Sequence, residues 1–209
     1  MPVPADAALV PHDVPNRIDF LSSNDDEWLS SASDALPPHR DHCLRVAAEL
    51  KALGRPFPRA LELGSGPGEL AETVLHEVPG LRLVCLDLSE GPRQEAPAHL
   101  GSKEGRMTCV TRSLFDPGWA DGLGRFDAVI VGPALHERHR GPGKVAFYAR
   151  VRPLLLPGGI LLLCDRATGA GDPRYAASLG VEDALGEAGW NSIQSLRQGQ
   201  GQVLLKARP

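Results

Sequence analysis

The chain lacks the features that mark membrane and secreted proteins. Its apolar runs, such as residues 159–164, are far too short to cross a bilayer. The N-terminus is rich in proline and acidic residues, and no basic segment followed by an apolar core is present there. These absences lead us to expect a cytoplasmic protein with no membrane partner.

Cysteine is scarce and its spacing is unfavourable for a metal site. The four cysteines, at positions 43, 85, 109 and 164, stand singly, without a Cys-x-x-Cys pair or a compact His/Cys cluster. Three of them lie within apolar runs, which is typical of buried, reduced thiols. We therefore expect no metal-binding residues.

An excess of positive charge is also missing. The formal net charge is −4 and the isoelectric point is about 6.0, so nothing attracts the whole chain to phosphate backbones or anionic membranes. We expect no nucleic-acid partner. The absence of a repeat with a period of about 20 to 50 residues argues against a solenoid or a propeller. With 209 residues and 42% hydrophobic content, the chain has material for one well-packed domain.

Strand and helix patterns alternate regularly from Asp41 onward. Short apolar runs predict strands at 59–63, 81–86, 107–111, 126–131 and 160–164. Apolar residues at helical spacing predict helices at 43–53, 70–78, 92–100, 147–155 and 181–188. Almost wholly apolar strands separated by helices are typical of a parallel sheet covered on both faces, so we predict a doubly wound α/β fold.

The C-terminal region departs from this alternation. Residues 191–196 and 202–207 read as two strands joined by a short glycine-containing loop, which predicts an antiparallel hairpin. Upstream, Pro153 is expected to kink the last turn of the helix at 147–155, and Pro157 to Gly159 to form the turn into the fifth strand.

Residues 1–40 form an N-terminal extension without a sustained period, ahead of a domain at 41–209. We expect Phe20 to Leu36 to fold over the site as a lid, with Trp28 among its apolar anchors, because no other segment is long enough to exclude water. The alternative is that Trp28 packs on the outside of the domain or against a second subunit, and a homodimer is possible on that reading.

A glycine-rich turn follows the first predicted strand and precedes a helix. Gly64, Gly66 and Gly68 would let backbone approach a ligand closely. Their spacing differs from the Gly-x-Gly-x-x-Gly of dinucleotide-binding proteins, and Glu69 would repel a pyrophosphate at the helix start.

This turn resembles the first motif of the class I S-adenosylmethionine-dependent methyltransferases, an acidic residue followed by Gly-x-Gly-x-Gly, here with Glu62 as the acid. The resemblance continues in order at residues 83–89, 125–131 and 154–163, which look like the second, fourth and fifth strands of that Rossmann-like fold. It covers roughly residues 41 to 209. The implied cofactor is S-adenosylmethionine.

The resemblance assigns roles residue by residue. The glycines would contact the aminoacid portion of the cofactor, Asp87 the two ribose hydroxyls, and Leu88 the adenine. The implied cofactor-binding set is Glu62, Gly64, Ser65, Gly66, Gly68, Asp87, Leu88, Ser113, Leu114 and Gly132. Purely structural roles are the alternatives for the two acids: Glu62 could brace the turn and Asp87 could end its strand. Phe115 could contact adenine or belong to the core.

His136 is the candidate catalytic residue. It follows the fourth strand at the distance where small-molecule enzymes resembling trans-aconitate methyltransferase carry a histidine, and it could remove a proton from the acceptor. It could instead cap or pack against the next helix, or merely touch the cofactor. Residues 137–140 are more typical of a solvated loop, although Arg138 or Arg140 could pair with an acceptor carboxylate.

Several acceptor classes are disfavoured. The Asn/Asp-Pro-Pro-Tyr motif of amino-group methyltransferases is replaced by Gly132-Pro133-Ala134-Leu135, no cysteine lies near this loop for pyrimidine C5 methylation, and no magnesium-binding carboxylate set is evident. We therefore expect O- or N-methylation of a small molecule. The alternatives are a cofactor-binding scaffold without turnover and a protein or nucleic-acid methyltransferase.

Overall fold

The computed structural model describes residues 40–66, 68–88, 105–132, 142–165, 180–199 and 202–209. The expected lid, the expected helix at 92–100 and the loop that contains His136 lie outside these described residues. Among the residues that are described, no helix is long and apolar enough to cross a membrane. Within the same ranges, no group of three or more His, Cys, Asp or Glu side chains could hold a metal ion.

Helices and strands alternate along the described chain. The helices are α2 (Arg40–Ala52), α3 (Glu69–Glu77), α5 (Pro142–Val151) and α7 (Val181–Glu187), with a 3₁₀ turn η3 at Arg152–Leu154. The strands are β1 (Arg59–Leu63), β2 (Arg82–Asp87), β3 (Met107–Thr111), β4 (Phe126–Val131), β5 (Leu155–Asp165), β6 (Ser192–Gly199) and β7 (Gln202–Arg208).

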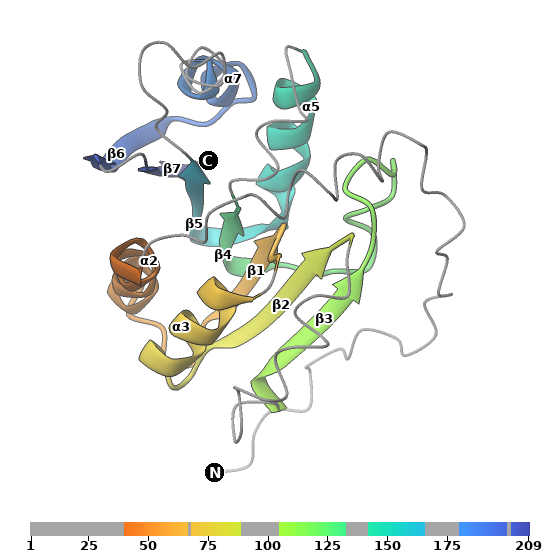
Figure 1. Cartoon of the computed structure of the whole chain (residues 1–209). Helices are drawn as coiled ribbons and strands as arrows, with labels where there is room; N and C mark the ends of the chain where they lie inside the picture. Colours follow the sequence, from red (N-terminus) through yellow and green to blue (C-terminus); the bar gives the residue numbers. More distant parts are fainter. Residues whose placement is uncertain (1–39, 67, 89–104, 133–141, 166–179, 200–201) are drawn as a thin grey trace.

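The strands form one seven-stranded sheet in the order β3-β2-β1-β4-β5-β7-β6 (Figure 1). Strands β1 to β5 pair in parallel, and β7 pairs antiparallel with both β5 and β6. The predicted doubly wound α/β fold with a C-terminal antiparallel hairpin is confirmed. The order reverses between β1 and β4, and in such sheets ligands bind beyond the carboxyl ends of the strands at that point.

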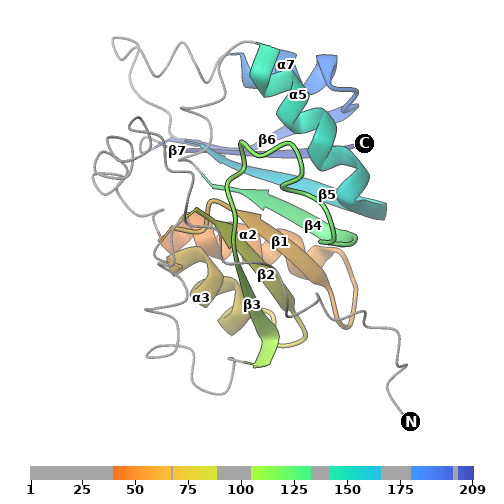
Figure 2. The same ribbon diagram turned by 90° about the vertical axis from the view of Figure 1, so that its right-hand side faces the viewer.

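Helices cover both faces of the sheet, with α2 and α3 on one and α5 and α7 on the other (Figure 2). Successive side chains of a strand point to opposite faces, so β1 contributes to two cores. Leu61 and Leu63 pack on the side of α5, whereas Ala60 packs with the residues of α2 and α3. Glu62 also faces α2 and α3, where its Oε2 accepts a hydrogen bond from the buried Cys85 thiol. The acid Glu62 is thus buried one residue before the end of β1.

The region around Pro153 differs from the prediction. Helix α5 ends at Val151, and the 3₁₀ turn η3 contains Pro153, whose missing N–H cannot continue the α-helical ladder. Leu155 was expected at the helix end but begins β5. Residues 157–159 do not precede the strand but lie inside it, where the pairing with β4 shifts register. Gly158, with φ of 78°, allows that irregularity.

The connection from β3 to β4 crosses the α5 face without a helix. Trp119 from this connection is 1% exposed and stacks on Phe147 of α5, with 5.8 Å between ring centroids. The Arg112 guanidinium donates hydrogen bonds to the carbonyl oxygens of Trp119 at 2.7 Å and Asp121 at 2.9 Å. These contacts hold residues 113–115 at the carboxyl edge of the sheet, beside β2.

Candidate functional site

The glycine-rich turn at the end of β1 has a backbone that other residues adopt only with strain. The φ angles of Gly64, Gly66 and Gly68 are 75°, 52° and 96°. A Cβ on Gly66 would meet nothing within 4 Å, so its backbone conformation, and not a lack of space, favours glycine there. The turn leads directly into α3, because the Gly68 carbonyl accepts the hydrogen bond of the Glu72 N–H at 2.9 Å.

Gly132, at the end of β4, requires glycine for a different reason. Its N–H donates to the Leu63 carbonyl at 2.9 Å, which draws the end of β4 against the turn. A Cβ on Gly132 would lie 2.5 Å from the Gly64 carbonyl oxygen, and backbone cannot easily move away. Two predicted site segments, from β1 and β4, are therefore in direct contact.

Asp87, the last residue of β2, ties the turn to the neighbouring strand. Its Oδ2 accepts a hydrogen bond from the Gly66 N–H at 2.8 Å, and its carbonyl oxygen accepts one from the Arg112 N–H at 2.9 Å. The carboxylate thus lies between the glycine turn and the segment after β3. The predicted cofactor residues of β1, β2, β3 and β4 come together at the carboxyl edge of the sheet.

Glu62 is buried below this edge. It is 2% exposed, and the Cys85 Sγ lies 3.6 Å from its Oε2 as a weak donor. Burial raises the pKa of Glu62 to about 8, the hydrogen bond from Cys85 lowers it, and the nearby Asp87 raises it further. At neutral pH, the carboxyl group of the ligand-free protein is therefore mainly protonated. A cation close to it would favour the ionised form.

The environment of two thiols near Glu62 favours their protonated form. Burial, followed by the charges of Glu62 and Glu69, raises the pKa of Cys43 to about 12. The pKa of Cys85 is also raised, chiefly by its hydrogen bond with Cys109 and by burial. A thiol with a raised pKa is inert because the thiolate is the reactive form. Chemistry at this edge must come from other groups.

The segment after β3 supplies both buried and exposed side chains. Ser113 and Leu88 are half-buried, and the Ser113 hydroxyl oxygen accepts the Phe115 N–H at 3.3 Å, so this hydroxyl braces the turn. Leu114 is 7% exposed and joins the apolar core, whereas Phe115 is 44% exposed. The Ser65 hydroxyl is buried and has no hydrogen-bond partner among the described residues.

The charges at this edge restrict the ligand. Glu69, in the first turn of α3, has its pKa raised by partial burial and by the charge of Glu72. Together with Asp87, it gives the edge an acidic character that disfavours a pyrophosphate, and Glu62 adds to this character when it is ionised. A cationic ligand with neighbouring hydroxyl groups fits better, because a carboxylate can accept from two hydroxyls.

Two residues that shape the site were not predicted. Arg112 holds the connection after β3, and Cys85 is the hydrogen-bond donor to Glu62. The contact of Cys85 with Glu62 depends on β1 and β2 being neighbours, whereas Arg112 contacts the carbonyl oxygens of its own connection, whose folding the sequence pattern does not specify. His136, the predicted catalytic residue, lies outside the described residues, so its position relative to Asp87 stays a prediction.

The central part of the chain matches the sequence model of a known protein family. Residues 61–161, from β1 into β5, match the family model described as a methyltransferase domain. This part of the chain, slightly less than half of its length, is therefore similar to methyltransferase domains. The glycine turn, Asp87 and Gly132 all lie within the matched residues.

Curated proteins with similar sequences are methyltransferases named for different acceptors. One is the release factor glutamine methyltransferase of Bordetella pertussis, 28% identical over 127 residues that cover 59% of this chain and 46% of that protein. Another is the tetracenomycin polyketide synthesis 8-O-methyl transferase of Streptomyces glaucescens, 33% identical over 128 residues that cover 60% of this chain and 35% of that protein. The chain spans less than half the length of these two relatives.

Solved structures of methyltransferases share the fold of this chain. An O-methyltransferase family protein from Burkholderia thailandensis has a TM-score of 0.64 and 20% identity, over 88% of this chain and 57% of that one. Human N-acetylserotonin methyltransferase, in complex with S-adenosylmethionine, has a TM-score of 0.59 and 20% identity, over 78% and 51%. The predicted resemblance to methyltransferases is confirmed at the level of domain and fold.

Proposed function

We propose that this chain transfers a methyl group from S-adenosylmethionine to an oxygen or nitrogen atom of a small-molecule acceptor. The observation that carries the proposal is the contact of Asp87 with the glycine turn, 2.8 Å from its Oδ2 to the Gly66 nitrogen, within a matched methyltransferase domain. S-adenosylmethionine supplies a methyl group on a cationic sulfonium. Its ammonium, sulfonium and ribose hydroxyls suit the acidic edge described above.

Each site residue has a proposed task. Asp87 accepts hydrogen bonds from the two ribose hydroxyls, and the backbone of Gly64, Gly66 and Gly68 allows the aminoacid portion to approach closely. Glu62 and the backbone at Gly132 lie toward the ammonium group. A cation there would stabilise the ionised form of Glu62 and so offset part of the free energy that burial of this charge costs.

The remaining proposed contacts are on the adenine side and at the acceptor. Leu88, Ser113 and Leu114 flank the adenine, and Ser65, in the glycine turn, contributes a cofactor contact. His136 removes the proton of the acceptor, and the chain's contribution beyond that is to align the acceptor atom with the methyl group. The small-molecule class follows from the missing sequence motifs of the other classes and from the acidic isoelectric point.

Calorimetric titration with S-adenosylmethionine and S-adenosylhomocysteine tests cofactor binding. Asp87→Ala should weaken both affinities by about 1.5–3 kcal/mol, or roughly 10- to 150-fold, because hydrogen bonds to a charged group are lost. Asp87→Asn, which keeps an acceptor for the Gly66 N–H, separates the ribose contact from the turn. Asp183→Ala, an exposed acid of α7, is the matched control and should bind as the wild type does. Absence of binding by the wild type would refute the proposal.

Turnover is tested separately by release of S-adenosylhomocysteine over a panel of hydroxyl, carboxyl and amine acceptors. His136→Asn should lower the rate without weakening cofactor binding. Binding without release on any acceptor would favour the scaffold alternative. Activity on protein or nucleic acid alone would overturn the small-molecule class.

A further inference from the structure

The edge of the sheet opposite the glycine turn is lined with arginines. Parallel strands begin at this amino edge, and the antiparallel β7 ends there. An arginine stands at or beside that end of five strands: Arg106 before β3, Arg82 in β2, Arg59 in β1, Arg125 before β4 and Arg208 in β7. In β1 and β2, which carry Glu62 and Asp87 near their carboxyl ends, the opposite ends of one strand therefore carry residues of opposite charge type.

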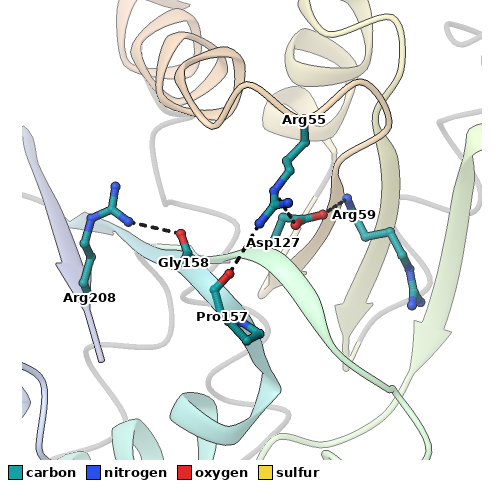
Figure 3. Close-up of polar contacts among 6 residues, drawn as sticks. All are labelled: Arg55, Arg59, Asp127, Pro157, Gly158 and Arg208. Carbon is teal, nitrogen blue, oxygen red and sulfur yellow. Dashed lines mark hydrogen bonds and ion pairs between the residues drawn. The ribbon is translucent and has the colours of Figure 1, made fainter.

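Arg55, in the loop before β1, belongs to the same surface (Figure 3). Its Nε lies 3.5 Å from the Asp127 Oδ1, and one of its terminal nitrogens donates to the Pro157 carbonyl at 3.4 Å. Asp127 is 8% exposed, and its Oδ2 accepts the Arg59 backbone N–H at 2.9 Å. This one carboxylate offsets the charge of Arg55, and the other arginine side chains of the edge form no ion pair with it among the described residues.

Two further guanidinium groups are held against the edge. Arg59 stacks over the Phe126 ring at 5.1 Å from its centroid and donates to the Arg125 carbonyl at 3.3 Å. Arg208 donates to the carbonyl of Gly158, within the irregular part of β5, at 3.1 Å (Figure 3). Each contact uses only part of the donor capacity of a guanidinium, which has five N–H groups.

Arg82 and Arg125 have exposed side chains, and among the described residues neither forms an ion pair or a side-chain hydrogen bond. Arg82 adjoins the loop before β1, because its N–H donates to the Pro58 carbonyl at 2.9 Å. The fold therefore uses the backbone of these two arginines, but no polar contact observed in the described part of the chain uses their side chains. Their charge is available to a partner.

Phe57 is presented beside these arginines. It is 74% exposed, the largest exposed fraction of any bulky apolar side chain among the described residues. Prolines on both sides restrict the loop, and Gly80 packs so closely beneath it that a Cβ there would collide with the Pro56 carbonyl oxygen. The exposed ring is therefore held by a constrained loop and loses little entropy on binding.

We propose that this amino-edge face, made of Arg55, Phe57, Arg59, Arg82, Arg125 and Arg208, docks an acidic surface of a partner protein with Phe57 as the central anchor. Arginine and aromatic side chains are enriched in the energetically dominant centres of protein interfaces. Guanidinium groups bind carboxylates in bidentate geometry. An anionic membrane is a poorer fit, because insertion needs several apolar side chains on one plane and this face offers one. The proposal is independent of methyl transfer.

The partner can be identified by photo-crosslinking of the full chain in the cells that make it. A benzophenone amino acid replaces Phe57, and the matched control carries it at Leu44, an exposed apolar residue of α2. We expect position 57, and not position 44, to capture a protein through a peptide of net negative charge. A phospholipid adduct, an adduct with residues 1–39 of the chain itself, or equal capture at both positions would overturn the proposal.

Binding of the captured protein, after purification, then provides the quantitative test. Arg82→Glu and Arg125→Glu should each weaken it at least tenfold, and Phe57→Ala similarly, whereas the charge-matched Arg150→Glu on α5 should change it less than twofold. Unchanged thermal unfolding and S-adenosylhomocysteine binding verify that each variant is folded. If Arg82→Glu fails to fold, Arg82→Ser replaces it. Equal binding by the wild type and the face variants would refute the assignment.

Discussion

The carboxyl edge and the amino edge of the sheet differ in the residues that line them. At the carboxyl edge, glycines bring backbone into contact, as where Gly132 approaches the Gly64 carbonyl, and acids such as Glu62 and Asp87 lie within or just below the surface. At the amino edge, arginines such as Arg82 and Arg125 extend into solvent around an exposed phenylalanine. The first edge has the features that we propose for binding a ligand, and the second those that we propose for docking a partner protein.

This difference separates residues that the fold depends on from residues that it does not. Substitutions at the carboxyl edge alter buried backbone and buried charge, so they should change both stability and cofactor affinity. Substitutions of Arg82 or Arg125 remove no observed contact, so they should change neither. Variants of the carboxyl edge and of the N-terminal extension can therefore test whether stability and cofactor affinity change together.

The largest effect is expected from removal of residues 1–36. Helix α2 ends at the amino edge, so its first residue, Arg40, lies toward the carboxyl edge, where the extension would join the site as a lid. Truncation should abolish turnover and weaken cofactor affinity at least about tenfold, or about 1.4 kcal/mol. The core should stay folded, since the sheet begins at Arg59. Equal affinity and activity of the truncated protein would contradict the lid, and circular dichroism checks folding.

Gly132→Ala should have the next largest effect. The added methyl group would lie 2.5 Å from the Gly64 carbonyl oxygen and 3.3 Å from that of Leu63, so the end of β4 must shift. We expect a stability loss of about 1–3 kcal/mol and weaker S-adenosylhomocysteine binding. Gly186→Ala, in α7 with nothing within 4 Å, should instead stabilise by roughly 0.5–1 kcal/mol. Thermal melting and calorimetry measure both variants, and a stable, tightly binding Gly132→Ala would show that the close approach is dispensable.

Glu62→Gln should change the pH dependence of stability. Burial raises the pKa of Glu62 from 4.5 to about 8, so the folded protein binds more protons than the unfolded chain between these values. Its stability should therefore fall as the pH rises from about 4.5 to about 8. The glutamine variant lacks this ionisation and should show a smaller decline, with a gain of roughly 1–3 kcal/mol at pH 9, where one pKa unit corresponds to about 1.4 kcal/mol. Urea unfolding from pH 5 to pH 9 measures it.

The control for this experiment is Glu49→Gln. Glu49 is also buried, but its carboxylate pairs with Lys206 at 2.8 Å and Arg45 at 3.1 Å. Glutamine there should lower stability by about 1–3 kcal/mol, because Lys206 loses its charged partner. The two substitutions should thus have opposite signs at pH 9. A parallel pH slope for Glu62→Gln and the wild type would disprove the proton uptake by Glu62.

Much of the fold could be predicted from hydrophobic pattern and turn residues. The strand at 126–131 matches β4 residue for residue, because all its residues are buried and the run is apolar except for Asp127. The helix expected to reach Leu155 stopped at Val151, since Pro153 removes a backbone donor and Leu155 pairs with Phe126 in the sheet. Which residues pair across the sheet depends on the tertiary structure, and the local spacing of apolar residues does not specify it.

The candidate site divides in the same way. The spacing of Gly64, Gly66 and Gly68 marks a turn with positive φ angles, and those angles are present. That the Gly66 N–H meets Asp87 and that Glu62 meets Cys85 depends on β1 and β2 being neighbours. The roles of these residues toward a cofactor remain predictions, as does the role of His136.

The sequence by itself determined which segments become strands and helices and that a glycine turn followed by an acid lies at strand ends, because these are local consequences of side-chain period and backbone freedom. Only the tertiary structure decided the strand order β3-β2-β1-β4-β5-β7-β6. That order aligns the arginines of separate strands along one edge and packs Gly132 against Gly64. Residues far apart in the chain acquire a common surface or a shared contact only when the sheet places their strands side by side.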